Sequence, residues 1–193
     1  MIKNNFNIII VGVGGQGLIT MTQILAQAAL IEGLDIKTSE LHGLSQRDGS
    51  VETAIRFGSK VFSPLVKQAG ANLIIALEMQ EALRACYYAS KESKTIFLIN
   101  EFIKTIPGSA LVKKDEITKG LQGFSEKIIS VPASEICAKE LNKEVVSGVY
   151  LVSLAALQNL IPIKPSSILK AIKKIIPNKY LELNIKTFNL AKN

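Results

Sequence analysis

Short apolar runs recur along the chain, and segments with helical periodicity separate them. A continuous apolar run of roughly four to eight residues is typical of a parallel strand that is buried on both faces. Residues 6–11 form a run of this kind, and further strands are expected at 73–77, 95–99 and 127–131. A helix from Leu18 to a stop at Gly33 joins the first run to a strand expected at 35–40, which makes one βαβ unit. This order of segments predicts an α/β fold with a mainly parallel, twisted sheet flanked by helices.

A different pattern covers residues 50–57. The alternating residues are Val51, Thr53, Ile55 and Phe57 on one side, and Glu52, Ala54 and Arg56 on the other. A period of two is typical of a strand with one polar face. We therefore expect an additional strand, for which the pattern allows an antiparallel orientation, and then a chain reversal at Ser63 and Pro64.

Helical periodicity marks most of the second half of the chain. The expected helices lie at residues 82–89, 133–141, 145–160, 166–176 and 180–191. The helix at 145–160 is almost entirely apolar, so we expect it to be buried against the sheet or a partner. The pattern weakens between 101 and 126, where we expect a connection with one short strand at 110–112 and one helical turn. Because no repeat, low-complexity tract or linker interrupts the chain, residues 1–193 are expected to form a single domain.

The junction between the first strand and the first helix is rich in glycine. The spacing G-x-G-x-x-G is matched by Gly12, Gly14 and Gly17, with Gly15 and Gln16 between the last two. Such a turn lets the backbone approach a ligand, and the unpaired N–H groups at the start of the helix favour an anion. The turn is not a Walker A loop, because Leu18 stands where that motif has lysine. The alternative is that the glycines only allow the strand and the helix to cross closely.

Residues 39–51 are polar, are punctuated by glycine, and hold the only histidine of the protein. A long connection inside a compact α/β domain often carries function, and several of these side chains are hydrogen-bond donors. The candidate ligand contacts are His42, Ser45, Gln46, Arg47 and Ser50. The alternative is a solvated connection whose polar residues serve no ligand.

Together these two stretches resemble a known family, the gamma domain of the 2-oxoacid:ferredoxin oxidoreductases. The residues that carry the resemblance are the glycine turn at 12–17 and the segments 39–47 and 49–51. Within that family the chain is most similar to the beta subunits of indolepyruvate ferredoxin oxidoreductases. The resemblance runs nearly end to end, with further matching positions at 62–65, 77–78 and 182–184. Two positions depart from it, since Asp48 stands where the family usually has glycine and Ser147 where it commonly has asparagine.

The resemblance implies a Rossmann-like subunit that supports catalysis without carrying the catalytic core. In such enzymes thiamine diphosphate and 4Fe–4S clusters belong mainly to a large alpha subunit, which oxidatively decarboxylates an aryl-pyruvate to an acyl-CoA. The implied partners are this alpha subunit and, through the complex, ferredoxin, whereas the chain itself has no catalytic residue and holds no cofactor alone. The residues that the resemblance places toward the cofactors, including coenzyme A, are Gly12, Gly14, Gly15, Gln16, Gly17, His42, Ser45, Gln46, Arg47 and Ser50.

Composition adds limits to this picture. A formal charge of +7 and a pI near 9.4 suggest an acidic partner or an anionic ligand, although lysine enrichment also serves solubility. Nucleic acid is a poor fit, because lysines such as Lys113 and Lys114 lie singly or in pairs among apolar residues without a recognised module. No apolar stretch reaches the ~20 residues that span a bilayer, and we expect no signal peptide before the first strand. We therefore expect a cytoplasmic protein that binds no membrane.

The metal-binding residues are few. Cys86 and Cys137 are the only cysteines, and both lie in apolar helical patterns, so we expect small buried side chains rather than a disulfide. One histidine cannot build the common histidine-based metal sites, and two separate cysteines cannot hold an iron–sulfur cluster. We therefore expect no metal in this chain.

Two other functions stay open from the sequence. A stand-alone dinucleotide-binding oxidoreductase would use the glycine turn with Glu40, an acid near the end of the second strand that can take ribose hydroxyls. A non-enzymatic interaction module of the same fold would need neither. Glu78 follows the strand at 73–77 and is either a ligand contact or a helix N-terminal acid. The sequence also leaves open whether the isolated chain forms a homodimer.

The purified chain, expressed alone, should be colourless, free of metal and inactive in 2-oxoacid oxidation. The reason is that a 4Fe–4S cluster takes four thiolates, whereas the chain offers Cys86 and Cys137 alone. Visible absorption spectroscopy combined with metal analysis checks this expectation. An iron–sulfur absorbance band that is stoichiometric with the monomer would contradict it.

Overall fold

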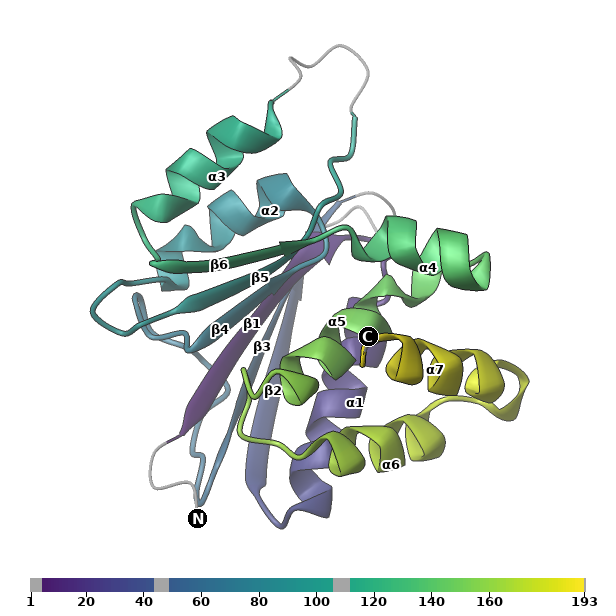
Figure 1. Cartoon of the computed structure of the whole chain (residues 1–193). Coiled ribbons are helices and arrows are strands. Elements are labelled where there is room, and N and C mark those ends of the chain that lie inside the picture. The colour runs from purple at the N-terminus through teal and green to yellow at the C-terminus, as the bar shows by residue number, and fades with distance from the viewer. Residues whose placement is uncertain (1–4, 44–48, 106–111, 193) are drawn as a thin grey trace.

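The computed structural model describes residues 5–43, 49–105 and 112–192. Within these residues the chain forms a six-stranded sheet with the strand order β2-β3-β1-β4-β5-β6 (Figure 1). The strands are β1 (Phe6–Val13), β2 (Asp35–His42), β3 (Ser50–Gly58), β4 (Leu73–Ala76), β5 (Ile96–Asn100) and β6 (Lys127–Val131). β3 is antiparallel to both of its neighbours, and the other neighbouring strands are parallel. The predicted Rossmann-like α/β fold with a mainly parallel sheet is confirmed.

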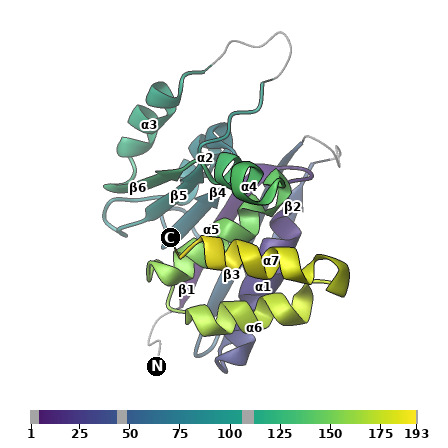
Figure 2. The ribbon, with the colours of Figure 1, turned by 45° about the vertical axis from the view of Figure 1, so that its right-hand side comes forward.

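Helices cover both faces of this sheet (Figures 1 and 2). The described α-helices are α1 (Leu18–Ile31), α2 (Met79–Arg84), α3 (Lys114–Gln122), α4 (Ala133–Leu141), α5 (Ser147–Leu157), α6 (Pro165–Ile175) and α7 (Asn178–Leu190). Residues of α1 and of α4 to α7 share one apolar core with the sheet, whereas α2 and α3 contribute to a second core on the opposite face. None of the helices in the described ranges is long and apolar enough to cross a lipid bilayer.

β1 is buried on both faces, as its apolar run predicts. Ile8 and Ile10 lie in the core on the α1 side, Ile9 lies in the core on the α2 side, and none of the three is exposed. Successive side chains of a strand point to opposite faces, so one run of isoleucine supplies both cores. Burying a side chain of this size contributes roughly 1.5–3 kcal/mol of stability. Because its side chains enter both cores, β1 joins the two halves of the structure.

The hairpin formed by β2 and β3 differs from the prediction in two ways. The strand expected at 35–40 does not neighbour the first strand, because β3 lies between β2 and β1. β2 also continues to His42, which pairs with Val51, so residues 39–42 belong to a strand and not to the polar loop. Both differences have one cause: the chain returns beside β2 in an antiparallel hairpin, and the returning strand takes the place next to β1. The additional strand expected at 50–57 is confirmed and is antiparallel.

The segment between β5 and β6 contains more regular structure than its weak pattern predicts. α3 is longer than the single helical turn expected, and its inner face is buried through Ile117 and Leu121. The short strand expected at 110–112 falls on Ala110 and Leu111, which lie outside the described residues, and on Val112, which has no regular structure.

The apolar helix expected at 145–160 is buried but shorter at both ends. A 3₁₀ helix, η2 (Glu144–Val146), precedes α5, which ends at Leu157. Gly148 lets α5 approach α1 closely, because a Cβ there would lie 2.8 Å from the sulfur of Met21. α5 also packs against α6, α7 and β5, which explains why it is apolar all round.

Leu151→Ala should lower the free energy of unfolding by roughly 2–5 kcal/mol, because the side chain is fully buried in α5 and its loss leaves a cavity. Leu30→Ala in α1 is the matched control, since Leu30 is 56% exposed and should change stability by less than about 0.5 kcal/mol. Urea denaturation of both variants measures the two changes. Equal losses would contradict the burial of α5 between the sheet and the outer helices.

Candidate functional site

The glycine turn connects β1 to α1, and its glycines serve different purposes. Gly15 and Gly17 have φ angles of 96° and 83°, in the left-handed region that other residues rarely adopt. Space is tight at Gly12, because a Cβ there would lie 2.7 Å from Gln16 Oε1, which would have to shift, and 3.1 Å from the Cβ of Leu77. The backbone path of the turn therefore needs glycine at these positions before any ligand is considered.

Gln16 bridges β1 and β4 beyond their last paired residues, Val11 and Ala76. Its Oε1 accepts a hydrogen bond from Val13 N at 2.8 Å, and its Nε2 donates to Leu77 O at 3.3 Å. The chain leaves β1 for α1 on one face and leaves β4 for α2 on the other, so a doubly wound sheet forms its crevice here. The sequence predicts a cofactor contact for Gln16, and the structure adds an internal role, because both ends of the amide are engaged within the protein.

A second amide shares the same carbonyl oxygen. Asn100, at the end of β5, donates from Nδ2 to Leu77 O at 3.1 Å and to Ser134 Oγ at 2.8 Å. Its Oδ1 accepts from Ser134 N at 3.0 Å, at the start of α4. Buried polar groups that are paired in this way are costly to disturb, so the bonds fix the carboxyl ends of three strands to α4. Asn100 was not predicted from the sequence, although a polar residue directly after the apolar run at 95–99 is a signal for this edge.

The two stretches predicted as a site meet at this edge of the sheet. Gly14 N donates to Gly49 O at 2.8 Å, and Val13 pairs with Ser50 in the ladder between β1 and β3. The described parts of the glycine turn and of the hairpin loop therefore lie together at this edge of the sheet. Three of the predicted contacts lie outside the described residues, namely Ser45, Gln46 and Arg47.

Ser50 connects the hairpin to α2. Its Oγ donates to Glu81 Oε2, and the other carboxylate oxygen of Glu81 lies 3.5 Å from Arg84 Nε. Glu81 is buried, so its carboxylate depends on such partners. The sequence predicts a cofactor contact for Ser50, and the structure shows its hydroxyl bonded to the protein itself.

Glu78 is the N-cap of α2. Its Oε2 accepts from Glu81 N at 2.9 Å, and its Oε1 accepts from Lys104 N at 3.0 Å. The side chain is buried, and this burial raises the pKa of the carboxyl above its usual value. Of the two interpretations that the sequence leaves open for Glu78, the helix N-terminal acid is confirmed. The same carboxylate fixes the segment after β5 against α2.

Two cavities open beside the glycine turn. The smaller, of about 220 Å³, lies between the turn and the start of α5, and its polar lining includes Lys104, Ser134, Glu144 and Ser147. The larger, of about 460 Å³, is mainly apolar and is lined in part by Val145, Val149, Ile176, Pro177 and Tyr180. Gln16 and Val145 border both cavities. The arrangement suits a ligand that joins an anionic group, held at the turn, to an apolar group.

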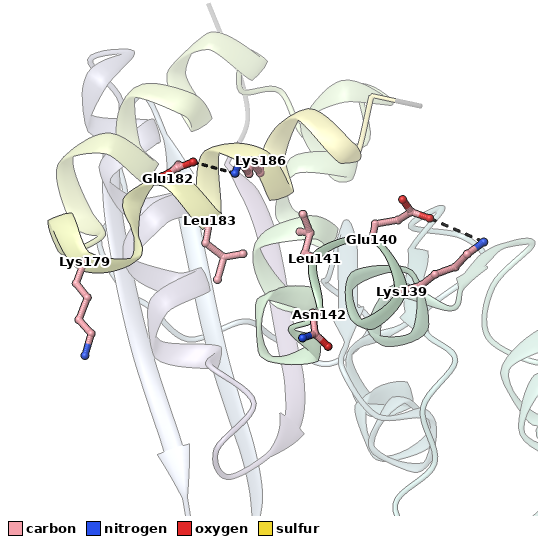
Figure 3. A pocket seen from close by; sticks show the side chains of 8 residues that line it. All are labelled: Lys139, Glu140, Leu141, Asn142, Lys179, Glu182, Leu183 and Lys186. Carbon is pink, nitrogen blue, oxygen red and sulfur yellow. Dashed lines mark ion pairs between the residues drawn. The ribbon is translucent and has the colours of Figure 1, made fainter.

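A third, more open groove lies between α4 and α7 (Figure 3). It has a volume of about 510 Å³ and shares Leu183 with the apolar cavity. Lys186 Nζ lies 2.8 Å from Glu182 Oε1 on α7. Lys139 Nζ lies 3.8 Å from Glu140 Oε1 on α4. Exposed ion pairs of this kind contribute only about 0–1 kcal/mol, so the groove is a charged surface and not a preorganised site.

Cys86 and Cys137 are buried free thiols, as the sequence predicts. Burial raises the pKa of each thiol to about 11, so both stay protonated near neutral pH. They also lie on opposite faces of the sheet, Cys137 in the α1-side core and Cys86 in the α2-side core. The two thiols therefore lack the clustered, deprotonated arrangement that ligation of an iron–sulfur cluster requires.

Glu40 does not occupy the position of a ribose-binding acid. It lies in β2 opposite Thr53, and the whole of β3 separates it from β1 and the glycine turn. Because neighbouring strands are about 4.8 Å apart, the backbones of β2 and β1 are about 10 Å apart. In a dinucleotide-binding fold the strand that carries the acid neighbours β1 directly. The strand order therefore gives no support to the stand-alone dinucleotide interpretation.

Comparisons with known proteins extend over nearly the whole chain. Residues 7–193 match the family model described as pyruvate ferredoxin/flavodoxin oxidoreductase. The indolepyruvate oxidoreductase subunit IorB of Archaeoglobus fulgidus is 36% identical over 193 residues, which cover 97% of this chain and 94% of that protein.

Two solved structures share the fold. The gamma subunit of a keto/oxoacid ferredoxin oxidoreductase from Geobacter sulfurreducens has a TM-score of 0.72 at 19% identity, covering 97% of this chain and 96% of that one. The 2-oxoglutarate:ferredoxin oxidoreductase from Magnetococcus marinus, with 2-oxoglutarate, coenzyme A and succinyl-CoA bound, has a TM-score of 0.71 at 19% identity. The match covers 98% of this chain but 31% of the Magnetococcus chain, so the fold is one part of that longer protein.

Gln16→Ala should lower the free energy of unfolding by about 1–3 kcal/mol, because Val13 N and Leu77 O both lose a partner. Gln16→Glu keeps the acceptor but loses the donor when the carboxyl is ionised. The protonated carboxyl can donate to Leu77 O, so folding raises its pKa. The loss should therefore be small below the unfolded pKa of about 4.3 and should grow as the pH rises through the higher folded pKa.

Urea denaturation of wild type and both variants, at about pH 4 and about pH 7, measures these differences. Each variant is compared with wild type at the same pH, which removes the contributions of other titrating groups. A Gln16→Glu variant as stable as wild type at the higher pH would show that the bond to Leu77 O does not stabilise the fold.

Proposed function

We propose that this chain, which belongs to the pyruvate ferredoxin/flavodoxin oxidoreductase family, is the smaller subunit of an indolepyruvate-type 2-oxoacid:ferredoxin oxidoreductase. The family resemblance predicted from the sequence is confirmed, and the chain is a subunit of a 2-oxoacid ferredoxin oxidoreductase. The observation that carries the finer assignment to aryl-pyruvates is the 36% identity to the Archaeoglobus subunit over 97% of this chain. In the complex, residues 1–193 act as a single gamma-type domain.

In this proposal the chain supplies no redox centre. A 4Fe–4S cluster takes four thiolates, and the chain's two thiols are protonated and lie in separate cores, so its residues do not fit such a cluster. We assign thiamine diphosphate and the clusters to a larger alpha subunit, which carries out the oxidative decarboxylation and passes electrons to ferredoxin. We place the complex in the cytoplasm, a compartment in which free thiols persist.

The contribution of the chain is proposed to lie at the glycine turn. Coenzyme A combines a diphosphate with a long, weakly polar arm, and the cavities beside the turn lie next to the start of α1 and have apolar walls. Coenzyme A, when bound, supplies the thiol that accepts the acyl group. Gln16 holds the N–H groups of the turn in place by fixing the turn to β4. The residues assigned to ligand contact are Gly12, Gly14, Gly15, Gly17, His42, Ser45, Gln46, Arg47 and Ser50.

Co-expression with a candidate alpha subunit tests the proposal. We expect the two chains to co-elute in size exclusion and to oxidise indolepyruvate in a reaction that requires coenzyme A and ferredoxin. Failure to form a complex, or a complex without this activity, would contradict the proposed function.

A thermal-shift experiment on the isolated chain addresses the dinucleotide alternative. NAD, NADP and FAD are compared with coenzyme A, each at high concentration. A true cofactor at a hundredfold excess over its Kd stabilises by about 2.7 kcal/mol, so its effect should be visible. We expect no such shift with NAD, NADP or FAD, and a clear shift with one of them would favour the stand-alone enzyme.

Arg47→Ala should raise the apparent KM for coenzyme A in the reconstituted complex about tenfold or more. A hydrogen bond between charged groups contributes roughly 1.5–3 kcal/mol, and alanine cannot replace the planar pair of donors that arginine offers to a phosphate. Arg47→Lys is the matched control, because it keeps the charge and loses the planar pair, and it should give an intermediate KM. Steady-state kinetics measures both, with assembly checked separately by size exclusion. Normal assembly with unchanged KM and turnover for Arg47→Ala would mean that the loop is structural.

A further inference from the structure

The end of the sheet opposite the glycine turn carries two large apolar side chains in water. Phe62 is 81% exposed and Leu65 is 70% exposed. They belong to the connection between β3 and β4, at the amino end of β1, where the N-terminus is marked in Figure 1. Single exposed apolar residues are ordinary, but two large apolar side chains exposed in one short loop need an explanation. We call residues 62–65 the apolar loop.

An arginine from β3 holds the apolar loop in place. Arg56 Nη1 donates to Ser63 O at 2.9 Å and to Leu65 O at 3.0 Å. Arg56 Nε donates to Asn7 Oδ1 at 3.0 Å, and Asn7 Nδ2 donates to Gly70 O at 2.7 Å. The guanidinium is thus bonded to backbone carbonyl groups of the loop and, through Asn7, to β1. Hydrogen bonds from a charged donor are stronger than neutral ones, so this brace fixes the path of a surface segment.

Two further features restrict the backbone of the apolar loop. Val66, directly after it, is buried in the α2-side core. Pro64 has a restricted φ, which lowers the number of conformations open to the loop. Phe62 and Leu65 are therefore presented on an ordered backbone, and little further entropy is lost when they enter a partner. Preorganisation of this kind strengthens binding, because it lowers the entropy that is lost when an interface forms.

Lysines flank the apolar loop in the sequence, at positions 60 and 67. Lys60 Nζ lies 4.9 Å from the centroid of the Phe62 ring. Ser93 Oγ donates to Ala69 O at 2.7 Å, which brings a lysine-bearing turn beside the chain that follows the loop. The exposed lysines in this region are Lys60, Lys67, Lys91 and Lys94. The nearby acids are Glu92 and Asp35, and Asp35 Oδ2 already accepts from Val61 N. Positive charge predominates, which fits a partner with acidic residues around an apolar pocket.

We infer that the apolar loop is the anchor by which this chain docks on the larger subunit of its complex. The identity of that partner rests on the proposed function. The Magnetococcus protein supports this occupant, because there the same fold is 31% of one chain, and the remainder, about twice as large, is covalently attached to it. A partner of that size can contact the apolar loop and still reach the glycine turn at the other end of the sheet. A second copy of this chain fits less well, since it would bring the exposed lysines near one apolar loop close to those of the other copy.

Surface-binding kinetics with the immobilised full chain and the purified larger subunit tests this inference. The test variant is Phe62→Ala with Leu65→Ala. The control is Leu30→Ala with Ile31→Ala, which removes two apolar side chains that are exposed at the end of α1. We expect the loop variant to bind at least about 30-fold more weakly, mainly through faster dissociation, and the control to change affinity less than about threefold. Lys60→Glu should slow association and weaken its dependence on salt.

Thermal melting and the self-association of each variant complete the experiment. Because Phe62 and Leu65 are largely exposed, the loop variant should melt like wild type. If it binds the larger subunit as tightly as wild type, the docking inference is overturned and the proposed function stands. If the wild-type chain itself fails to bind, both are overturned. If the loop variant loses only a self-dimer and keeps its affinity for the larger subunit, the apolar loop belongs to a contact between copies, and the inference is wrong.

Discussion

The side-chain amide of Gln16 bridges the ends of β1 and β4, the two central strands of the sheet. β1 and β4 are the neighbouring strands at which the chain changes from one face of the sheet to the other, and strand ends separate into a crevice at such a point. Gln16 spans this crevice by bonding to Val13 N and Leu77 O, and Asn100 bonds to the same carbonyl from the next strand. The turn can hold this position because Gly12 leaves room for the amide, where a Cβ would lie 2.7 Å from Oε1.

This internal closure gives the two ends of the sheet different tasks in the proposed complex. At the carboxyl end the Gln16 amide fills the crevice from within, so a ligand can reach the outer side of the glycine turn and the cavities next to it. At the amino end Arg56 uses the same principle, a polar side chain bonded to backbone groups, to order an exposed apolar loop. In the proposed complex the chain would therefore hold a partner at one end of the sheet and complete a ligand site at the other.

Periodicity placed most elements because burial itself is periodic, and the runs at 127–131 and 133–141 coincide with β6 and α4. The strand order could not be predicted in this way, since it depends on whether β2 or β3 lies next to β1. Pairing between distant segments determines this order. α3 was underestimated because two buried residues on nine give a weak pattern. For the site, glycine spacing predicted the turn. The hydrogen bond from Gln16 to Leu77 O joins residues 61 positions apart, and no local pattern encodes that bond.

Hydrogen exchange at the start of α1 tests the central claim most directly, that the glycine turn faces a ligand in the assembled enzyme. The first N–H groups of a helix lack an intrahelical acceptor, and in α1 they belong to Leu18, Ile19 and Thr20. Adding coenzyme A to the complex should slow exchange at these amides at least about tenfold and leave the outer face of α6 unchanged. Equal exchange at the turn with and without coenzyme A, in a complex that is active, would contradict this account.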